Sequence, residues 1–190
     1  MTIGFALCGS FCTYGKVFPI LEELAKTYDI IPIFSEISQK TDSRFGNSQD
    51  FLARAETICN HAPLLTIPQV EPIGPKKLLD LLVIAPCTGN TLAKLSNGIA
   101  DGPVTMAVKS HLRNGRPVVL AVSTNDALSG AAENIGRLLN RKHFYFVPFR
   151  QDDWAKKPTS MVAAFEKLPE TIEGALDGKQ VQPIILGALP

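Results

Sequence analysis

The residues best suited to chemistry lie at Pro86–Thr91, where the sequence PCTGNT follows the apolar run Leu81–Ala85. The apolar run predicts a strand buried on both faces, which Pro86 is expected to end. A helical pattern follows, and Thr88 or Asn90 can cap its start, because each side chain has an oxygen that accepts from a free amide of the first turn. Hydroxyls beside unpaired amides predict an anion site, such as one for a cofactor phosphate. The alternative is that these residues serve only the geometry of a turn.

Three further predicted strands also end in polar turns. The strands expected at 3–7, 30–34 and 116–122 are followed by turns that contain Ser10, Ser35 and Ser123, respectively. In open α/β sheets, ligands bind outside the carboxyl ends of the strands. We therefore expect these serines and Thr88 to converge on one crevice, although they are far apart in the sequence. The first turn lacks the GxGxxG pattern, so the dinucleotide-binding fingerprint is absent.

The order of the elements predicts the fold class. Strand and helix patterns alternate, which is typical of an α/β protein with a three-layer α/β/α, Rossmann-like (flavodoxin-like), doubly wound parallel sheet. Further strands are expected at 64–67 and 144–147, the latter being the last, and helices at 14–27, 50–61, 76–79, 103–114, 127–140 and 168–176. The segments 36–48 and 68–75 are predicted to be loops, the first of them a surface loop or a lid.

The carboxyl-terminal part of the chain differs in composition. The segment 149–158 combines several charges with the only tryptophan, Trp154. Two interpretations remain open for it: a cover over a site or an interface, and an ordered surface segment. Residues 178–190 are predicted to form a tail without periodicity.

Length and composition exclude several classes of protein. The 190 residues predict a single domain over 1–190, and 45% hydrophobic with 19% charged residues is typical of a soluble globular protein. A net charge of +1 gives no electrostatic case for nucleic-acid or membrane partners. The cysteines show no CxxC pair and no metal-ligand spacing, so we expect reduced thiols, no metal and a cytosolic location; they are Cys8, Cys12, Cys59 and Cys87.

The segment PCTGNTLAKLSNGIAD resembles the signature of a flavoprotein family that contains flavin-dependent cysteine decarboxylases and flavin prenyltransferases. The matching residues are Pro86, Thr88, Asn90, Thr91, Ala93, Lys94, Gly98, Ile99, Ala100 and Asp101. The resemblance covers residues 1 to about 147. It implies FMN bound to a Rossmann-like sandwich, and a homo-oligomer that is a trimer or a multiple of one.

The resemblance also implies which residues bind the flavin. Its phosphate would lie at Ser10, Ser35 and Thr88. The turn around Asn90, Thr91 and Asn125 would lie near the isoalloxazine ring or its substrate. Hydroxyls and amides suit this task because they donate to phosphate oxygens without lysine or arginine. The full implied set is Gly9, Ser10, Phe11, Ser35, Pro86, Thr88, Gly89, Asn90, Thr91, Ser123, Thr124 and Asn125.

The departures from the family pattern bear on the reaction. Cysteine decarboxylases carry a histidine before the central strand, where this chain has Pro72–Pro75, and of their Pro-Ala-Met-Asn stretch only Asn125 is kept. The lysine of flavin prenyltransferases is replaced by Asn90. No general base is evident in the four turns, so the catalytic residues stay unassigned. The nearest carboxylates, Glu36, Asp101 and Asp126, are interpreted as caps or solvated charges.

Further segments resemble one branch of this family: LCGSFCTYGK, STNDALSGAAENIGRLLN, HFYFVPFRQDD and GKQVQP. That resemblance implies an oxidoreductase subunit that acts with a second, A-type subunit on a cyclic dicarboxylate, in the cytoplasm of the mother cell of a sporulating bacterium. A non-catalytic partner of the A-type subunit and a cysteine-conjugate decarboxylase remain alternatives. A dicarboxylate needs cationic partners, but a solvated role is the default for the lysines and arginine near the crevice, which are Lys16, Lys40, Arg44 and Lys94.

Overall fold

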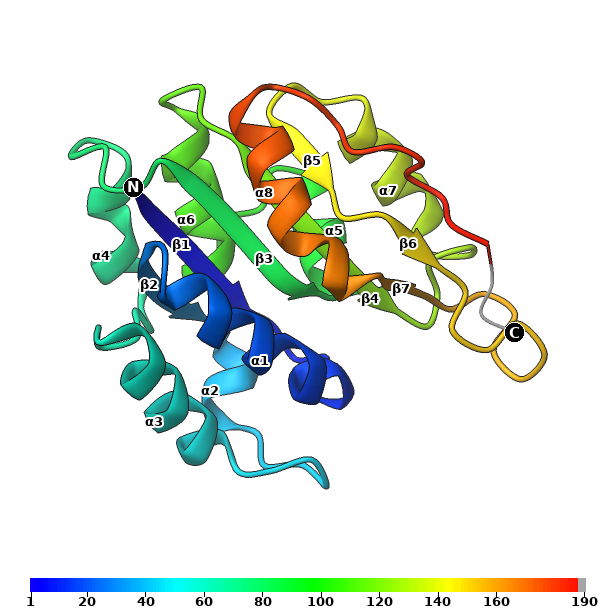
Figure 1. Cartoon of the computed structure of the whole chain (residues 1–190), viewed down its shortest axis with the longest axis horizontal. Helices are drawn as coiled ribbons and strands as arrows, with labels where there is room; N and C mark the ends of the chain where they lie inside the picture. Colours follow the sequence, from blue (N-terminus) through cyan, green and yellow to red (C-terminus); the bar gives the residue numbers. More distant parts are fainter. Residues whose placement is uncertain (188–190) are drawn as a thin grey trace.

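The computed structural model describes residues 1–187, and its centre is a mixed sheet (Figure 1). Five parallel strands stand in the order β2-β1-β3-β4-β5, and two short strands, β6 and β7, continue the sheet antiparallel from the end of β4. The strands are β1 (Thr2–Leu7), β2 (Asp29–Phe34), β3 (Leu81–Cys87), β4 (Val118–Thr124), β5 (Phe144–Phe146), β6 (Phe149–Arg150) and β7 (Met161–Ala163). The predicted α/β fold class is confirmed, with an antiparallel addition that the sequence pattern does not reveal.

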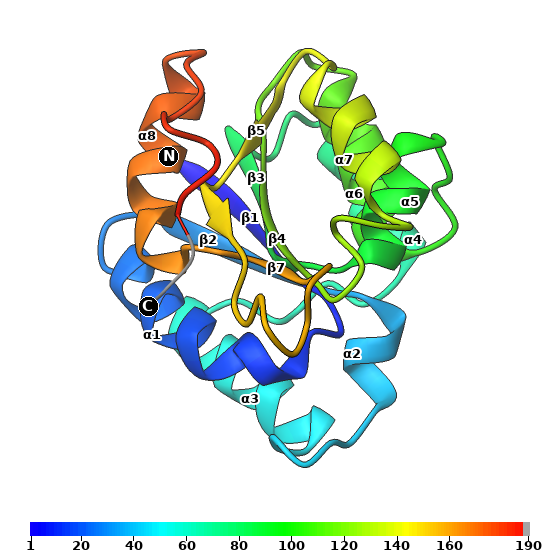
Figure 2. The same cartoon turned by 90° about the vertical axis from the view of Figure 1, so that its right-hand side faces the viewer.

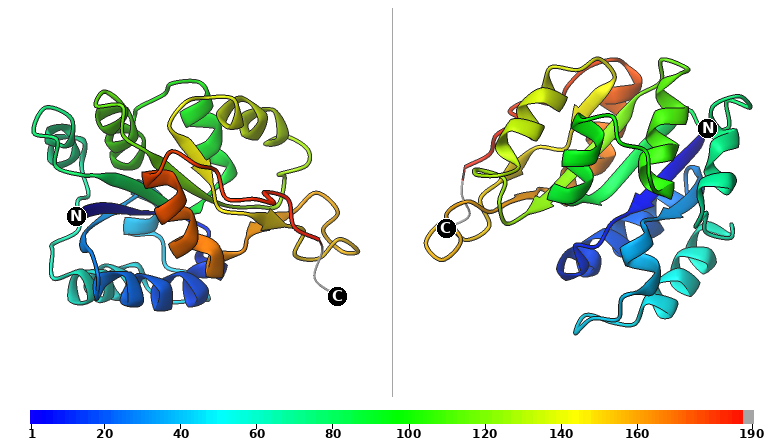
Figure 3. Two further views of the ribbon diagram at one scale, coloured as in Figure 1. Left: turned by 45° about the horizontal axis from the view of Figure 1, so that its top comes forward. Right: turned by 180° about the vertical axis from the view of Figure 1, so that it is seen from behind.

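Helices cover both faces of the sheet and make three layers (Figures 2 and 3). One face carries α1 (Tyr14–Ala25), α3 (Ser48–Cys59) and α8 (Leu168–Leu176). The other carries α4 (Ile67–Val70), α5 (Gly89–Ser96), α6 (Pro103–Leu112) and α7 (Ala132–Leu139). The short helix α2 (Glu36–Lys40) follows β2, and single 3₁₀ turns occur at η1 (Phe11–Thr13), η2 (Glu71–Ile73) and η3 (Phe165–Lys167).

Alternation along the central strands divides the core into two halves. In β3, Leu81, Val83 and Ala85 face the α1 side, whereas Leu82 and Ile84 face the α6 side, and all five are fully buried. This is the pattern expected of a strand covered by helices on both faces. Helices thus pack against both faces of the sheet, and the polar turns lie at its carboxyl edge.

Several predicted boundaries are wrong. Pro86 does not end its strand. The pairing of β3 with β4 shifts register between Ile84 and Cys87, which accommodates Pro86 although it has no amide hydrogen to donate, and pairing resumes at Cys87. The expected loop at 36–48 begins with α2. The helix expected at 127–140 starts only at Ala132, after a run of turns. The strand at 144–147 is not the last, since β6 and β7 follow.

The region between α3 and β3 also differs from the predicted elements. A strand at 64–67 is reduced to a single bridge between Ile33 and Leu64. Ile67 instead begins α4, where the Gln69 side chain accepts from the Thr66 amide at 3.0 Å. Prolines near the starts of α4 and η2 occupy first-turn positions, where a missing amide costs nothing. The helix expected at 76–79 is not formed: residues 76 and 77 are in a turn, and residues 78 and 79 have no regular structure.

The predicted tail at 178–190 is fixed to the sheet as far as it is described, and residues 188–190 lie outside the described part. The Gln180 side chain donates to the Phe146 carbonyl and accepts from its amide, both at 2.7 Å. Further on, the Phe149 amide donates to the Ile184 carbonyl at 3.0 Å. Within residues 1–187, no helix has both the length and the apolar character needed to cross a membrane.

Candidate functional site

The polar turns at the ends of β1, β2, β3 and β4 surround two hollows that meet at Thr88. The first, which we call the α5 hollow, has a volume of about 350 Å³ and is lined by Ser35, Glu36, Ile37, Lys40, Thr88, Asn90, Thr91, Lys94 and residues 101–105. The second, the hairpin hollow, has about 230 Å³ and is lined by Gly9, Ser10, Cys12, Thr13, Thr88, Asp152, Lys157 and the ranges 123–125 and 160–162. The four turns thus do not share the single crevice that was expected: Ser35 lines the first hollow, Ser10 and Ser123 line the second, and Thr88 lines both.

Thr88 connects the end of β3 with the start of α5. Its Oγ1 accepts from the Thr91 amide at 3.3 Å, so Thr88 is the N-cap that the sequence left open between two residues. The same oxygen lies 3.1 Å from the Thr91 Oγ1, which also donates to the Cys8 sulfur at 3.3 Å. The first turn of α5 and its hydroxyls are thereby fixed beside both hollows.

Gly89 allows the turns after β3 and β4 to approach each other. A Cβ at this position would lie 2.7 Å from the Thr124 Oγ1 and 2.9 Å from an Asp126 carboxylate oxygen. The Thr124 hydroxyl donates to that carboxylate at 2.5 Å, which holds both side chains in place. Asp126 is thus a structural acceptor, in agreement with its interpretation as a cap or solvated charge.

Serine hydroxyls link turns that are distant in the sequence. The Ser10 and Ser123 Oγ atoms are 2.8 Å apart, which joins the ends of β1 and β4 across the end of β3. At the end of β2, the Ser35 Oγ lies 2.7 Å from the Ser38 Oγ, and Ser38 donates to the Leu7 carbonyl. These bonds set the positions of neutral donors along the carboxyl edge of the sheet.

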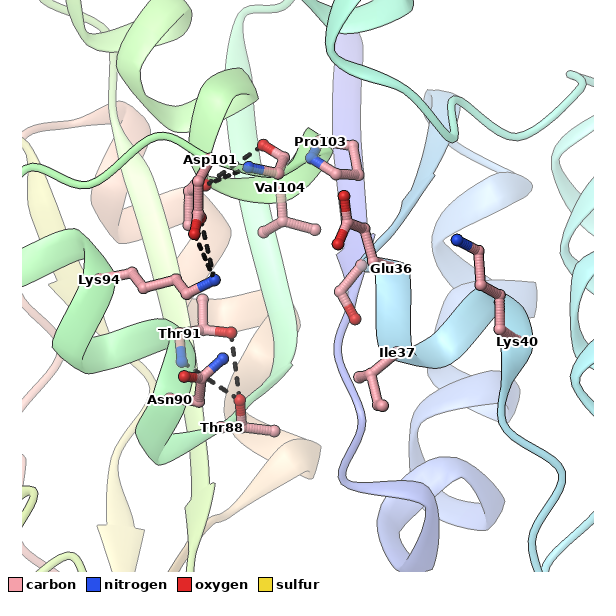
Figure 4. A pocket seen from close by; sticks show the side chains of 13 residues that line it. Glu36, Ile37, Lys40, Thr88, Asn90, Thr91, Lys94, Asp101, Pro103 and Val104 are labelled. Carbon is pink, nitrogen blue, oxygen red and sulfur yellow. Dashed lines mark hydrogen bonds and ion pairs between the residues drawn. The ribbon is translucent and has the colours of Figure 1, made fainter.

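The charges around the α5 hollow are balanced. Lys94 donates to both carboxylate oxygens of Asp101 at 2.9 Å, and this bond holds the pKa of Asp101 below its ordinary value. Glu36 and Lys40 of α2 lie on the opposite side, facing Thr88, Asn90 and Thr91 of the α5 side (Figure 4). An anion held here would be bound mainly by hydroxyls and backbone amides rather than by an excess of positive charge.

Not every predicted site residue lines a hollow. Phe11 packs against Tyr14 and Phe51, with ring centroids 5.4 and 6.4 Å away. Pro86 is buried in β3 and Gly89 lies behind the α5 turn. The other nine predicted residues line one or both hollows: Gly9, Ser10, Ser35, Thr88, Asn90, Thr91, Ser123, Thr124 and Asn125.

Sequence reasoning left out residues that lie far from the turns in the chain. Asp152, Lys157 and Ser160 line the hairpin hollow, and residues 102–105 line the α5 hollow. The change of composition after Phe149 was the one available signal for the first group. Of the two interpretations left open for 149–158, the geometry supports a cover over a site.

The thiols and acidic groups offer little for nucleophilic or metal chemistry. Burial raises the pKa of the Cys8 thiol to about 11 and raises that of Cys87 as well, so both stay protonated. Cys12 is exposed at the rim of the hairpin hollow. Among the described residues, no cluster of three or more His, Cys, Asp or Glu side chains is arranged to hold a metal ion.

Comparison with known proteins places this geometry in a family. A family model described as "Flavoprotein" matches residues 1–172. The B subunit of dipicolinate synthase from Bacillus subtilis (strain 168) is 46% identical over 185 residues, which cover 97% of this chain and 92% of that protein. The crystal structure of the corresponding B subunit from Bacillus halodurans has a TM-score of 0.90 at 44% identity and covers 99% of this chain and 97% of that one.

A more distant structure shares the fold alone. The FMN-dependent cysteine decarboxylase SpaF has a TM-score of 0.69 at 21% identity, with 92% of this chain and 97% of that one covered. The family match over most of the chain, together with the high identity to the Bacillus proteins, decides the classification. The chain belongs to the flavoprotein family.

Proposed function

We propose that this chain is the flavin-binding B-type subunit of a dipicolinate synthase, which forms dipicolinate from a dihydrodipicolinate-type intermediate together with an A subunit. One observation carries the proposal: 46% identity to the B subunit of the Bacillus subtilis dipicolinate synthase over 97% of the chain. The identity extends past the sheet into the carboxyl-terminal part, which includes the segment that closes the hairpin hollow.

The residues of the α5 hollow fit FMN. The Ser35 and Thr88 hydroxyls and the amides at the start of α5 are donors suited to a phosphate group. A volume of about 350 Å³ lies within the range of cofactor pockets, roughly 300–1,000 Å³. Balanced charges on the rim leave the phosphate to these neutral donors, as the sequence predicts.

Bound flavin would supply a two-electron acceptor for the ring hydrogens lost on aromatisation. The chain's own contribution is to bind and orient. Thr88 and Thr91 fix the start of α5, and Asn90 and Asn125 present amide groups toward the α5 hollow and the hairpin hollow, respectively. The hairpin hollow adjoins the α5 hollow at Thr88, so it is the place for a substrate beside the flavin ring.

The broader assignment follows from the same resemblance. We expect one domain over 1–190, a homo-oligomer that is a trimer or a multiple of one, association with the A subunit, and action in the mother-cell cytoplasm of a sporulating bacterium. Decarboxylation of a cysteine conjugate is disfavoured by the lack of a histidine in the segment 72–75.

The first test is an FMN titration of the purified chain, followed by quenching of flavin fluorescence. We expect saturable binding of about one FMN per chain. Absence of binding at high micromolar FMN would contradict a flavoprotein in use and favour a non-catalytic partner that stabilises or activates the A subunit.

The second test measures dipicolinate formation with the A subunit present. A double variant, Thr88→Val with Asn90→Ala, removes an N-cap hydroxyl and an amide that line the α5 hollow. We expect loss of both FMN binding and turnover. Full activity of this variant would argue that the chemistry takes place entirely on the A subunit.

A further inference from the structure

A third hollow lies away from the polar turns, between the end of α5 and the side of α6, and we call it the α6 groove. Its volume is about 420 Å³, which exceeds that of the α5 hollow and that of the hairpin hollow. Its residues come from the end of α5, the segment 98–100, α6, Arg141 and the start of β5. The two helices lie on the same side of the sheet (Figure 2). A hollow of this size lies within the range of ligand pockets, roughly 300–1,000 Å³.

The wall of the α6 groove is apolar. Leu95, Val108 and Phe144 are buried in it, whereas Ile99 is 47% exposed. The turn that ends α5 holds Ile99 in place, because the Gly98 amide donates to the Leu95 carbonyl at 3.2 Å and the Ile99 amide donates to another α5 carbonyl at 2.9 Å. Gly98 has a φ of 72°, the left-handed conformation typical of this helix ending. A fixed apolar side chain is therefore presented to solvent, and apolar surface with a polar rim is typical of a ligand groove.

The rim of the α6 groove is cationic. Lys109 and Arg113 are exposed, lie one turn apart on α6, and take no part in an ion pair among residues 1–187. Arg141 donates to the Leu95 and Ser96 carbonyls at 3.1 and 2.7 Å, which caps the end of α5. No acidic side chain of the described part of the chain lines the groove. Two neighbouring cations are therefore available to an anion.

The residues that α6 contributes set the shape of the groove. They recur at helical spacing and so form one face of the helix: Thr105, Val108, Lys109, Leu112 and Arg113. From Thr105 to Arg113 this face is about 12 Å long, at about 1.5 Å per residue. The two free cations lie in its second half, whereas Thr105 at the other end also lines the α5 hollow. The groove is thus elongated and apolar, with its charge toward one end.

We propose that the α6 groove binds an anion with an extended apolar body, such as a medium-chain carboxylate. The carboxylate accepts from Lys109 and Arg113, and the alkyl chain lies along Val108, Leu95 and Ile99. Binding removes the exposed apolar surface of Ile99 from water, which is favourable. This site goes beyond the proposed function and uses none of the residues that the proposed function assigns to flavin.

Charge favours such a ligand over a second copy of this chain. In a two-fold contact both copies use the same surface, so the groove of one copy would bring its cationic rim against that of the other. Like charges that face each other oppose association. An anionic ligand instead neutralises Lys109 and Arg113.

Three probes test the head group and the alkyl chain by calorimetry, each below the concentration at which it forms micelles. Dodecanoate has a carboxylate and a long alkyl chain, hexanoate has a carboxylate and a short one, and dodecyltrimethylammonium has a long one with the opposite charge. We expect saturable binding of about one dodecanoate per protein chain. The other two probes should each bind at least about tenfold more weakly, because hexanoate buries less apolar surface and the ammonium head group meets cations.

Variants of the groove separate the two contacts. Lys109→Gln together with Arg113→Gln should weaken dodecanoate binding about tenfold and remove the preference over dodecyltrimethylammonium. Ile99→Ser should weaken both long-chain probes about threefold or more, since it removes part of the apolar wall. As a matched control, Arg137→Gln together with Lys142→Gln removes the same charge from α7 and the turn before β5, outside the groove. The control should leave dodecanoate affinity within about twofold.

The outcomes separate this inference from the proposed function. Absence of saturable dodecanoate binding, equal binding of the two long-chain probes, or equal losses in the groove and control variants would overturn the inference. An assembly of copies that Ile99→Glu dissociates in sedimentation, without dodecanoate binding, would also overturn it, because the groove would then be an interface between copies. Failure of the FMN titration overturns the proposed function alone, and FMN binding without dodecanoate binding overturns this inference alone.

Discussion

The two hollows that meet at Thr88 are built from different kinds of structure. The α5 hollow is formed where parallel strands end and helices begin, so its donors are placed by the sheet itself. The hairpin hollow uses the same edge for one wall and a loop between two very short antiparallel strands for the other. A cofactor-type site can thus stay constant while the loop determines what binds beside it.

The two hollows also differ in how well their charges are satisfied. In the α5 hollow both oxygens of Asp101 accept from Lys94. In the hairpin hollow one oxygen of Asp152 is buried without a partner among the described residues. The first carboxylate is fully paired with a lysine, whereas the second has only one oxygen near a lysine, Lys157 at 3.3 Å. The charged side chains in the wall of the hairpin hollow, Asp152 and Lys157, thus both come from the loop between β6 and β7.

Replacement of the segment 151–160 between β6 and β7, which we call the hairpin loop, should have the largest effect on this contrast. A glycine–serine linker in place of 151–160 removes Asp152 and Lys157 but leaves the carboxyl edge of the parallel strands intact. We expect turnover with the A subunit to be lost, because the hairpin hollow loses one wall, and FMN affinity to change by less than about threefold, because no residue of 151–160 lines the α5 hollow. Dipicolinate formation and flavin fluorescence measure the two quantities.

Circular dichroism and thermal unfolding of the same variant show whether it is folded. Loss of FMN binding by a folded variant would mean that the loop also belongs to the flavin site. The division between a constant and a variable hollow would then be wrong.

Acid should weaken the fold near the start of β4, at the end of the sheet opposite the hollows, before it alters the charges of the hollows. Burial lowers the pKa of His111 from 6.5 to about 4, and its Nδ1 has no partner among the described residues. Between pH 6.5 and about pH 4, His111 binds a proton in the unfolded chain but not in the folded chain. The free energy of unfolding therefore falls as the pH drops through this range. The full effect is about 3 kcal/mol, of which about 2 kcal/mol appears between pH 7 and pH 5.

Urea unfolding at several pH values measures this slope. The variant His111→Gln keeps a donor for the Pro117 carbonyl, now bound by the His111 Nε2 at 3.0 Å, and should show a flatter dependence on pH. Because the pKa values of Asp101 and Asp152 are lowered, both carboxylates stay ionised over this range. An equal slope in the variant would assign the acid sensitivity to other groups.

The contrast between the hollows also explains what the sequence could predict. Leu81–Ala85 and the cap at Thr88 follow from local patterns, a buried run and a hydroxyl before a helix, and both are observed. The strands β6 and β7 comprise two and three residues, too few for a periodic pattern. The position of Asp152 depends on pairing between β4 and β7, which no local rule specifies.

Thr88→Val tests the one residue that belongs to both hollows. It keeps the branched shape but removes the cap of α5 and a hydroxyl shared by both ligand sites. We expect FMN affinity to fall about tenfold and the free energy of unfolding to fall by about 1 kcal/mol. Thr57→Val, at an exposed position within α3, should leave FMN affinity unchanged and the free energy of unfolding within about 0.5 kcal/mol. Equal effects of the two substitutions would remove Thr88 from the site.

The turns after β3 and β4 approach each other closely at Gly89, beneath the α5 hollow. Gly89→Ala places a Cβ 2.7 Å from the Thr124 Oγ1, so the bond from Thr124 to Asp126 must shift, and we expect a loss of about 1–2 kcal/mol in the free energy of unfolding. Gly136→Ala, within α7, meets no atom within 4 Å and should gain about 0.5–1 kcal/mol. Thermal unfolding of both variants measures these opposite signs. A gain in stability from Gly89→Ala would show that the turns after β3 and β4 can move apart. Because Thr124 lies in the wall of the hairpin hollow, that hollow would then change its shape with the turns instead of being fixed.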